Sequence, residues 1–240
     1  MTILSKTWIY LKKSAKGFGE HPYFTTATSL IQYFPVWIKH LGQGRNPVSD
    51  KMPWLTFSSI NFIEKIIEPQ MTVFEYGSGG STLFWASRVK KVTSIEHDKE
   101  WYEKMKTELS TRKIENVDYL LLQEECDTEY NKKDFRNPYH YISADPKYTG
   151  NSFKRYARSI DSYNAQGFDI IVIDGRARPS CLLHAIQTIK KKGFIIIDNT
   201  ERTYYLESFN LDSKQWRKWD FFGPVPYSFD FSKTTILKKL

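Results

Sequence analysis

The sequence lacks the features that would place the protein in a membrane or in an oxidising compartment. No apolar run approaches the roughly 20 residues that an α-helix needs to cross a bilayer. The first residues, MTILSKTWIYLKKSAKG, have no long apolar stretch after the first lysine and do not resemble a secretory signal peptide. Only two cysteines occur, Cys126 and Cys181, without metal-ligand spacing, which favours free thiols over a single disulfide. We therefore expect a cytoplasmic protein.

Internal repeats and low-complexity segments are also missing, so a repeat architecture is not indicated. The 240 residues are 40% hydrophobic and 26% charged, as in a soluble protein with one domain and an appendage. The net charge of +8 permits an acidic partner such as nucleic acid, anionic lipid or an anionic metabolite. Because the basic residues are spread along the whole chain, a solvated basic surface is the simpler explanation.

The amino-terminal 50 residues are predicted to form a helical extension or cap. From Ile3 to Lys16 the apolar residues Leu4, Trp8, Leu11 and Ala15 recur at helical spacing, with lysines elsewhere. Such a basic amphipathic helix can lie on a membrane surface, but docking on the main domain is commoner, and we favour it. A second helical piece, SLIQYFPVWIKHL, should be interrupted near Pro35. The segment 42–53 is rich in glycine, proline and turn formers and is predicted to be a linker.

Beyond this linker, short apolar runs alternate with helical patterns. Strands are expected over residues 71–76, 91–98, 117–123, 168–174 and 194–199. Helices are expected over 56–67, 81–89, 99–110, 152–167 and 180–193, the last closed by Gly193. An inserted loop should cover about 124–149, and two β-rich pieces around Gly223–Pro224 end the chain. This alternation predicts an α/β fold, a Rossmann-like, doubly wound and mainly parallel sheet over residues 51–240 with a carboxyl-terminal antiparallel strand pair.

The stretch EYGSGGST follows the first strand of this sheet and predicts a ligand site. Gly77 and Gly79 let the backbone turn tightly and approach a ligand, and the next helix presents free N–H groups. Glu96 ends the second strand about 20 residues after Gly77, where a carboxylate can accept both hydroxyls of a ribose. Thr82 stands where a dinucleotide fingerprint has glycine or alanine, and no Gly-Lys-Ser/Thr of a P-loop is present. Glu75, before the turn, would repel a pyrophosphate and suits a cationic ligand.

On these residues the sequence resembles the class I S-adenosylmethionine-dependent methyltransferases. VFEYGSGGST is similar to their first motif, with Glu75 as its acid, and Glu96 matches their ribose-binding acid. FDIIVIDG, ending in Asp174 and Gly175, is similar to their fourth motif, and the tail resembles their closing strand pair. The resemblance covers about residues 52–240 and implies that Gly77, Ser78 and Gly79 hold the methionine end of the cofactor. It also implies that the sulfonium lies near Glu75 and that adenine lies around residues 123–125.

Asp174, Asp198 and Asn199 are the candidate reaction-centre residues. They end neighbouring parallel strands, which lie about 5 Å apart, so their oxygens can converge. Such oxygens could bind a divalent cation such as Mg2+, which would acidify an acceptor hydroxyl, and the metal-dependent catechol-type O-methyltransferases resemble this chain at these positions. The chain departs from them at GRARPSC, where Arg176 and Arg178 could clamp an anionic acceptor or the cofactor carboxylate, or pair within the fold. Without metal, Asp174 would be a base or an orienting group.

These predictions define the expected function as S-adenosylmethionine-dependent methyl transfer, with O-methylation of a small, possibly anionic molecule placed first. RNA or another nucleic acid is an alternative acceptor that is supported only by the charge. A binding protein that keeps the nucleoside-cofactor site without turnover is a second alternative. An NAD-dependent oxidoreductase is a third, against which Glu75, Thr82 and the carboxyl-terminal strand pair argue. Nothing in the sequence predicts the oligomeric state.

Overall fold

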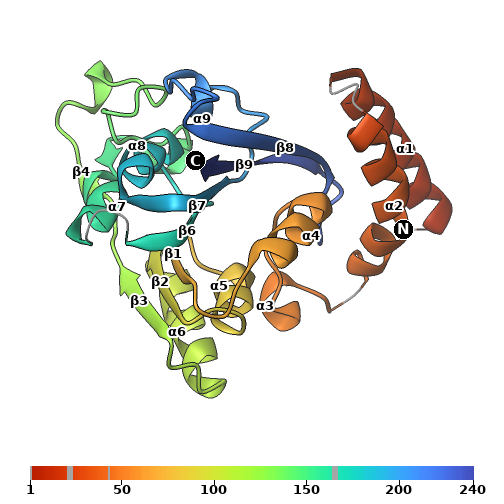
Figure 1. Ribbon diagram of the computed structural model, residues 1–240, viewed down its shortest axis with the longest axis horizontal. Helices are drawn as coiled ribbons and strands as arrows, with labels where there is room; N and C mark the ends of the chain where they lie inside the picture. Colours follow the sequence, from red (N-terminus) through yellow and green to blue (C-terminus); the bar gives the residue numbers. More distant parts are fainter. Residues whose placement is uncertain (1, 21–23, 43, 164–166) are drawn as a thin grey trace.

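The computed structural model describes residues 2–20, 24–42, 44–163 and 167–240, and Figure 1 shows them as a central twisted sheet with helices on both faces. The main sheet has the strand order β3-β2-β1-β6-β7-β9-β8. Strands β3, β2, β1, β6 and β7 are parallel, and β9 runs antiparallel to both of its neighbours, β7 and β8. Its strands are β1 (Thr72–Tyr76), β2 (Lys91–Glu96), β3 (Val117–Leu121), β6 (Phe168–Ile173), β7 (Ile189–Ile197), β8 (Trp216–Pro224) and β9 (Phe231–Lys239). The predicted fold class is confirmed.

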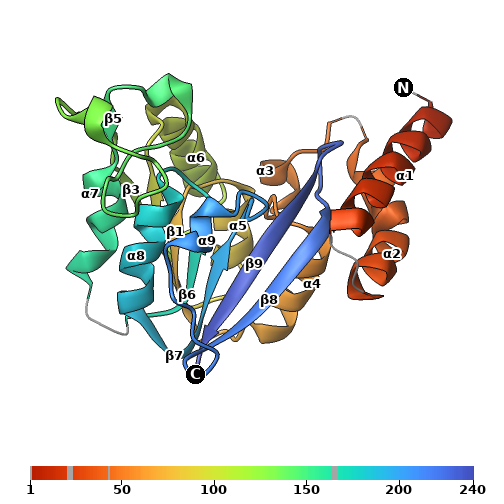
Figure 2. The same cartoon turned by 90° about the horizontal axis from the view of Figure 1, so that it is seen from above.

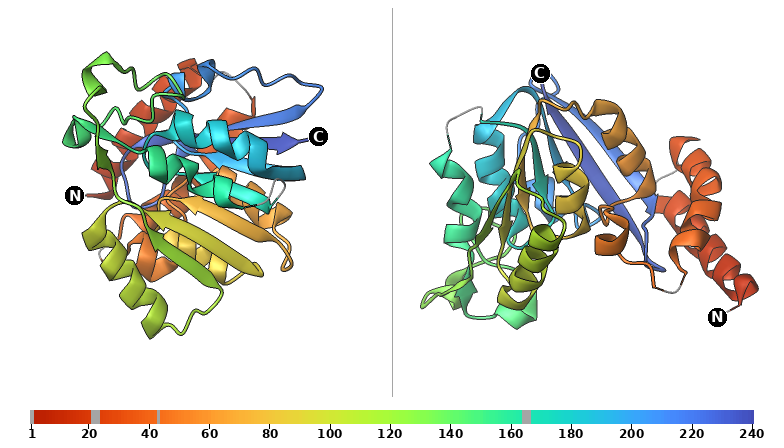
Figure 3. Two further views of the ribbon diagram at one scale, coloured as in Figure 1. Left: turned by 90° about the vertical axis from the view of Figure 1, so that its left-hand side faces the viewer. Right: turned by 90° about the horizontal axis from the view of Figure 1, so that it is seen from below.

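Two hydrophobic cores lie on opposite faces of this sheet. One contains side chains of α4 and α5, including Ile63 and Trp85, and α6 continues the same layer; the other contains side chains of α7 and α8, including Tyr156 and Leu182. The layers are seen edge-on in Figure 3. The helices are α1 (Ile3–Glu20), α2 (Phe24–His40), α3 (Pro47–Asp50), α4 (Phe57–Ile66), α5 (Gly80–Ala86), α6 (Lys99–Thr111), α7 (Lys154–Arg158), α8 (Arg178–Thr188) and α9 (Tyr204–Glu207).

The central strands form where the sequence is most apolar. In β6 the side chains of Ile170, Ile171 and Ile173 are fully buried, because helices cover both faces of a parallel strand at this position. The inserted segment, by contrast, has little regular structure. It contains the strand β4 (Glu125–Cys126), which pairs with β5 (Asn151–Ser152), and short 3-10 turns at Tyr130–Lys132 and Pro146–Tyr148.

Three local predictions were wrong. The helix before Gly193 ends at Thr188, and the lysines that follow already belong to β7. The pairing of β7 with β6 shifts register between Phe168 and Ile170, so β7 contains a bulge that takes up these additional residues. Helix α2 continues through Pro35 because packing on its neighbours compensates for one missing N–H donor. Gly223 and Pro224 end strand β8, and the chain turns after them.

The predicted helix over 152–167 is also shorter than expected. It consists of α7 followed by a 3-10 turn over Ser159–Ser162, and residues 164–166 lie outside the described part of the chain. The predicted linker 42–53 contains α3, which packs against α5. A Cβ atom on Gly80 would lie only 2.1 Å from the Pro47 carbonyl oxygen, so this segment is part of the packed domain.

Helices α1 and α2 form an antiparallel pair at the end of the molecule farthest from β3, as Figures 1 and 2 show. Tyr10 and Trp37 are buried here, their rings are 4.8 Å apart, and the Tyr10 ring also contacts Phe231 of β9. The predicted docking stripe is not the side that docks: Leu4 and Trp8 remain 79% and 63% exposed. No helix in the described ranges is long and apolar enough to cross a membrane.

Candidate functional site

The candidate site lies where the strand order of the sheet reverses. The chain runs from β1 outward through β2 to β3, and then returns to place β6 on the other side of β1. Such switch points, at the carboxyl ends of parallel strands, are where open α/β sheets bind ligands. The loop after β1 meets the loop after β6 at this point. Gly77 has φ +91°, and a Cβ atom there would lie 3.0 Å from Gly175, so both the turn and the close approach require glycine.

Glu75 lies beneath the glycine turn and does not line the cavity above it. Its side chain is fully buried, and its Oε2 accepts hydrogen bonds from the hydroxyls of Thr82 (2.5 Å) and Ser94 (2.7 Å). Thr82 Oγ1 in turn accepts a hydrogen bond from the Gly79 N–H. Glu75 therefore supports the glycine turn from below. Thr82, at the position where a dinucleotide fingerprint has glycine or alanine, connects Glu75 to the turn. Gly79 has φ 169°, an extended conformation open to any residue, so the turn itself does not require glycine there.

Glu96 connects the glycine turn to the end of β2. Its Oε2 accepts hydrogen bonds from the Ser78 N–H (3.1 Å) and the Ser78 hydroxyl (2.8 Å), while its Oε1 accepts the backbone N–H groups of His97 and Asp98. The side chain is 3% exposed. Burial alone would raise the pKa of Glu96, but the hydrogen bonds from His97, Asp98 and Ser78 hold this pKa below its ordinary value. The carboxylate is therefore charged at neutral pH, with its edge facing the cavity.

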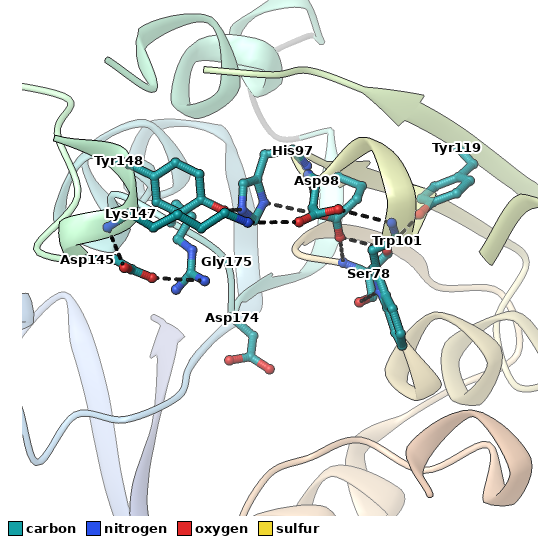
Figure 4. Close-up of polar contacts among 12 residues, drawn as sticks. Ser78, His97, Asp98, Trp101, Tyr119, Asp145, Lys147, Tyr148, Asp174 and Gly175 are labelled. Carbon is teal, nitrogen blue, oxygen red and sulfur yellow. Dashed lines mark hydrogen bonds and ion pairs between the residues drawn. The ribbon is translucent and has the colours of Figure 1, made fainter. Parts of the chain in front are cut away.

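A cavity of about 350 Å3 opens between these loops. Figure 4 shows Ser78 and Trp101 on one side of it and His97 and Tyr148 on the other. The Trp101 indole N–H donates to the Ser78 carbonyl oxygen (2.9 Å), and the Tyr148 hydroxyl lies 2.8 Å from His97 Nε2. The cavity is lined by Gly77, Ser78, Glu96, His97, Asp98, Trp101, Lys147, Tyr148, Asp174, Gly175 and Arg176.

Sequence reasoning missed several of these lining residues. The predicted adenine segment 123–125 lies outside this cavity, and Lys147 and Tyr148 of the insertion line it instead. Asp98 caps α6 by accepting the Trp101 N–H, and Lys147 Nζ lies 3.3 Å from its carboxylate. The position of Trp101, in the first turn of the helix that follows the second strand, could have indicated that it lines the site. Tyr148 offered none, because the insertion has no periodicity.

Asp174 and Asp198 end neighbouring strands, as predicted, and they line a second cavity of about 450 Å3 together with Asn199. Asp174 borders the first cavity as well, so its carboxylate lies between the two. Burial raises the pKa of Asp174, and the Arg178 guanidinium, with Nη2 2.9 Å from Asp174 Oδ1, opposes this rise. Burial and the adjacent Asp174 raise the pKa of Asp198 to about 8, so Asp198 is mostly protonated at neutral pH. Because Arg178 pairs with Asp174, we assign the negative charge of the two aspartates to Asp174.

The predicted metal ligands do not fit a divalent cation well. Arg178 already pairs with Asp174, the Thr234 hydroxyl donates to Asp198 Oδ1 (2.8 Å), and the Asn199 amide donates to Ser232. The Arg178 guanidinium beside the Asp174 carboxylate repels a divalent cation. Because the Asn199 amide nitrogen points toward Ser232, its oxygen, the atom that could bind a metal, points away from this residue. Among the described residues, no group of three or more His, Cys, Asp or Glu side chains could hold a metal ion.

The arginines of the GRARPSC loop have different positions. Arg178 is 9% exposed and donates to the carbonyl oxygens of Gly175, Asp198 and Asp174, so it serves the fold. Arg176 lies 3.3 Å from Asp145, is 35% exposed, and its buried Nε has no hydrogen-bond partner. It lines a third cavity, of about 460 Å3, that also borders Gly175. Further residues around this cavity include Phe135, Ile142, Arg202, Tyr204 and Tyr205.

Solved structures share this arrangement of the chain. A candidate methyltransferase from Streptococcus mutans, SMU.1697c, solved in complex with S-adenosylhomocysteine, matches 76% of this chain and 96% of its own length at TM-score 0.52 and 14% identity. A candidate O-methyltransferase from Klebsiella pneumoniae matches 88% of this chain and 89% of its own, at TM-score 0.50 and 13% identity. A candidate rRNA methylase from Clostridium thermocellum matches 76% and 94%, at TM-score 0.50 and 14% identity.

No family model and no curated protein matches the sequence. The structural likenesses nevertheless agree with the strand order and with the antiparallel pair at the carboxyl terminus. The chain therefore has the fold of the class I S-adenosylmethionine-dependent methyltransferases, as the sequence resemblance implied.

The two carboxyl groups with raised pKa values predict that stability falls as pH rises. Burial raises the pKa of Glu75 to about 7, and the pKa of Asp198 is raised to about 8. The folded state therefore retains protons that the unfolded chain releases above its ordinary carboxyl pKa. We expect the free energy of unfolding to fall between about pH 5.5 and pH 7.5, by at most about 1.4 kcal/mol per pH unit for each group. Urea unfolding at several pH values measures this slope.

Replacing Glu75 by glutamine should make the slope shallower, because one titrating group is removed. Glu68→Gln, at an exposed position before β1, is the matched control and should leave the slope unchanged. A Glu75→Gln variant with the wild-type slope would contradict the raised pKa of the buried Glu75 carboxyl group.

Proposed function

We propose that this protein is an S-adenosylmethionine-dependent methyltransferase. The observation that carries the proposal is the cavity at the switch point, bounded by the Gly77 turn and the buried Glu96, in a fold that a structural neighbour shows with S-adenosylhomocysteine. We also propose that residues 51–240 form the methyltransferase domain and that residues 1–50 are an addition to it, with α3 packed at the boundary.

The cavity suits a cationic nucleoside. Glu96, Asp98 and Asp174 contribute carboxylates to its wall, while Trp101 and Tyr148 contribute aromatic surface. Glu96 Oε2 now accepts the Ser78 hydroxyl, which is the type of contact that a ribose hydroxyl would make. We propose that Glu96 and Ser78 contact the ribose, and that Gly77 and Gly79 let the backbone approach the methionine part. Glu75 stabilises the turn from beneath by accepting hydrogen bonds from Thr82 and Ser94.

Asp174 is the residue that we propose for chemistry. S-adenosylmethionine supplies a methyl group by in-line displacement, so the protein mainly has to align the acceptor and remove its proton. Asp174 borders both the cofactor cavity and the neighbouring 450 Å3 cavity, which places its carboxylate at the junction where the two substrates would meet. Its raised pKa makes it a stronger base than an exposed aspartate, and the ion pair with Arg178 holds it in position.

The acceptor that we propose is a small, anionic, aromatic molecule with a hydroxyl group. The second cavity shares Asp174 with the cofactor cavity, and its wall combines Trp54 and Phe231 with the guanidinium of Arg202. Arg202 is exposed and donates to the Tyr205 hydroxyl (2.9 Å), so its charge can still reach a bound anion. The cavity volume, about 450 Å3, is in the range of small-molecule sites.

Nucleic acid is the second candidate acceptor, and two observations favour it. The chain carries a net charge of +8, and the Clostridium neighbour is described as an rRNA methylase. Binding through phosphates would weaken steeply with salt, because each neutralised phosphate releases counterions. A steep salt dependence of RNA binding, together with methyl transfer to RNA, would favour this acceptor over the small molecule.

Calorimetry with S-adenosylhomocysteine and with NAD tests the cofactor. We expect a measurable affinity for S-adenosylhomocysteine and none for NAD, because three carboxylates against the two cations Lys147 and Arg176 leave the cavity wall net negative, which disfavours a pyrophosphate. Methyl transfer is then assayed against hydroxylated aromatic acids and RNA, each with and without EDTA. We expect no effect of EDTA, since Arg178 competes with a cation at Asp174. Absence of S-adenosylhomocysteine binding would overturn the proposal, and binding without transfer to any acceptor would favour a non-catalytic cofactor-binding protein.

A further inference from the structure

Helix α1 turns an apolar stripe toward solvent instead of toward the protein. We call this stripe the outer stripe, and it repeats at the spacing of a single helix face. It consists of Leu4, Trp8, Leu11 and Phe18, which are 79%, 63%, 61% and 44% exposed. The inward side of the same helix holds Tyr10 and Gly17, and Gly17 lies so close to Phe222 that a Cβ atom would clash with its ring. The packing of α1 is therefore complete without the outer stripe.

The flank of the outer stripe is basic. Lys12 and Lys16 are exposed, and Lys12 Nζ lies 5.4 Å from the Trp8 ring centroid. The sequence has no acidic residue before Glu20, so no carboxylate interrupts the positive charge along the first four turns of the helix. Lys13 pairs with Asp230 of the β8–β9 connection, which fixes the helix with its outer stripe facing away from the sheet.

An exposed apolar stripe with a tryptophan and flanking lysines has the composition of a helix that lies in a membrane interface. In such helices the apolar face enters the boundary between headgroups and acyl chains, and the lysines contact anionic headgroups. A second copy of this chain is a poorer occupant. Pairing two outer stripes would bring Lys12 and Lys16 of both copies together, and Glu20, whose carboxylate lies 3.8 Å from Lys16 Nζ, offsets only part of this positive charge.

We propose that the outer stripe of α1 docks this protein on an anionic lipid surface. Trp8, Leu11 and Leu4 enter the interface, and Lys12 and Lys16 contact the lipid phosphates. The attachment is peripheral and reversible, because one short amphipathic face buries limited apolar area. It does not depend on the cofactor binding proposed above, because no residue of α1 lines the cofactor cavity.

Sedimentation of the full chain with vesicles tests the proposal. We expect binding to vesicles rich in phosphatidylglycerol, weak binding to pure phosphatidylcholine, and loss of the difference at high salt. The double variant Trp8→Ser/Leu11→Ser should lower the partition coefficient about tenfold or more, because two large apolar side chains no longer enter the interface. Its matched control is Leu120→Ser/Tyr139→Ser, which replaces two other exposed apolar side chains, 42% and 67% exposed, and should bind as the wild type does.

Two charge-reversal variants distinguish binding through the basic flank of α1 from attraction by the overall positive charge of the protein. Lys12→Glu/Lys16→Glu should lower anionic-vesicle binding about tenfold or more, while Lys90→Glu/Lys106→Glu, an equal change at exposed lysines elsewhere, should have little effect. Equal losses in both variants would overturn the proposal in favour of unspecific charge attraction. Absence of vesicle binding by the wild type would also overturn it. So would self-association, seen by light scattering, that the Trp8→Ser/Leu11→Ser variant abolishes, because the stripe would then be a subunit contact.

Discussion

Replacing Asp174 by asparagine should lower kcat by roughly 100- to 10,000-fold, the range that a positioned general base contributes. Affinity for S-adenosylhomocysteine should change little, because Asp174 borders the cofactor cavity at its junction with the second cavity and its side chain makes none of the hydrogen bonds that Glu96 and Thr82 make to the glycine turn. The kcat is measured once an acceptor has been identified, and calorimetry measures the cofactor affinity of the same variant.

Two neighbouring variants make this prediction specific. Asp198→Asn should retain most of the activity, since Asp198 is already largely neutral at pH 7. Arg202→Gln should raise the KM for an anionic acceptor and leave kcat closer to the wild-type value, because a binding contact is lost rather than a base. Equal losses of turnover and of cofactor affinity in Asp174→Asn would show that Asp174 supports the cavity and does not act in the chemistry.

Replacing Glu96 by glutamine should weaken S-adenosylhomocysteine binding at least about tenfold, because a charged acceptor of several hydrogen bonds is lost. The same change should lower the free energy of unfolding by about 2–4 kcal/mol, since an amide nitrogen would face the backbone N–H groups that the carboxylate now accepts. Calorimetry and urea unfolding measure the two effects.

The pH dependence of the free energy of unfolding provides a second test of the Glu96→Gln prediction. The pKa of Glu96 is lowered in the folded protein, so its contribution to stability is present above the ordinary carboxyl pKa and is lost as pH falls through the folded value. The stability difference between wild type and Glu96→Gln should therefore narrow in acid. Glu100→Gln, on the exposed first turn of α6, is the control and should bind the cofactor normally. Wild-type cofactor affinity in Glu96→Gln would refute the proposed ribose contact.

The hydrophobic patterning of the sequence was sufficient to predict the sheet and most of its strands. β1 and β6 are apolar runs that only a strand covered on both faces can bury, and the alternation with helices predicts their parallel order. Gly77 was predictable for a related reason: a turn with positive φ that touches the next loop tolerates no side chain. Both features are local consequences of chain chemistry.

What the side chains of the glycine turn do could not be predicted from their order. Glu75 and Glu96 both follow apolar runs, yet Glu75 is buried under Thr82 and Ser94, and Glu96 is held by Ser78 beside the cavity. The difference comes from the packing of neighbouring strands and loops, which decides which carboxylate faces the ligand space. The contribution of Tyr148 likewise depends on an aperiodic insertion folding back over β2.

The sequence by itself determined the α/β architecture, the glycine turn at the end of β1 and the acidic residues at the strand ends, because periodicity and backbone sterics act over short distances. Only the tertiary structure decided which of those acids line a cavity, and that Arg178 pairs with Asp174, which the sequence had predicted to be a metal ligand. It also decided that α1 docks through Tyr10 and leaves Trp8 exposed. An amphipathic pattern fixes which residues share a face, but the surface against which that face packs depends on the rest of the chain.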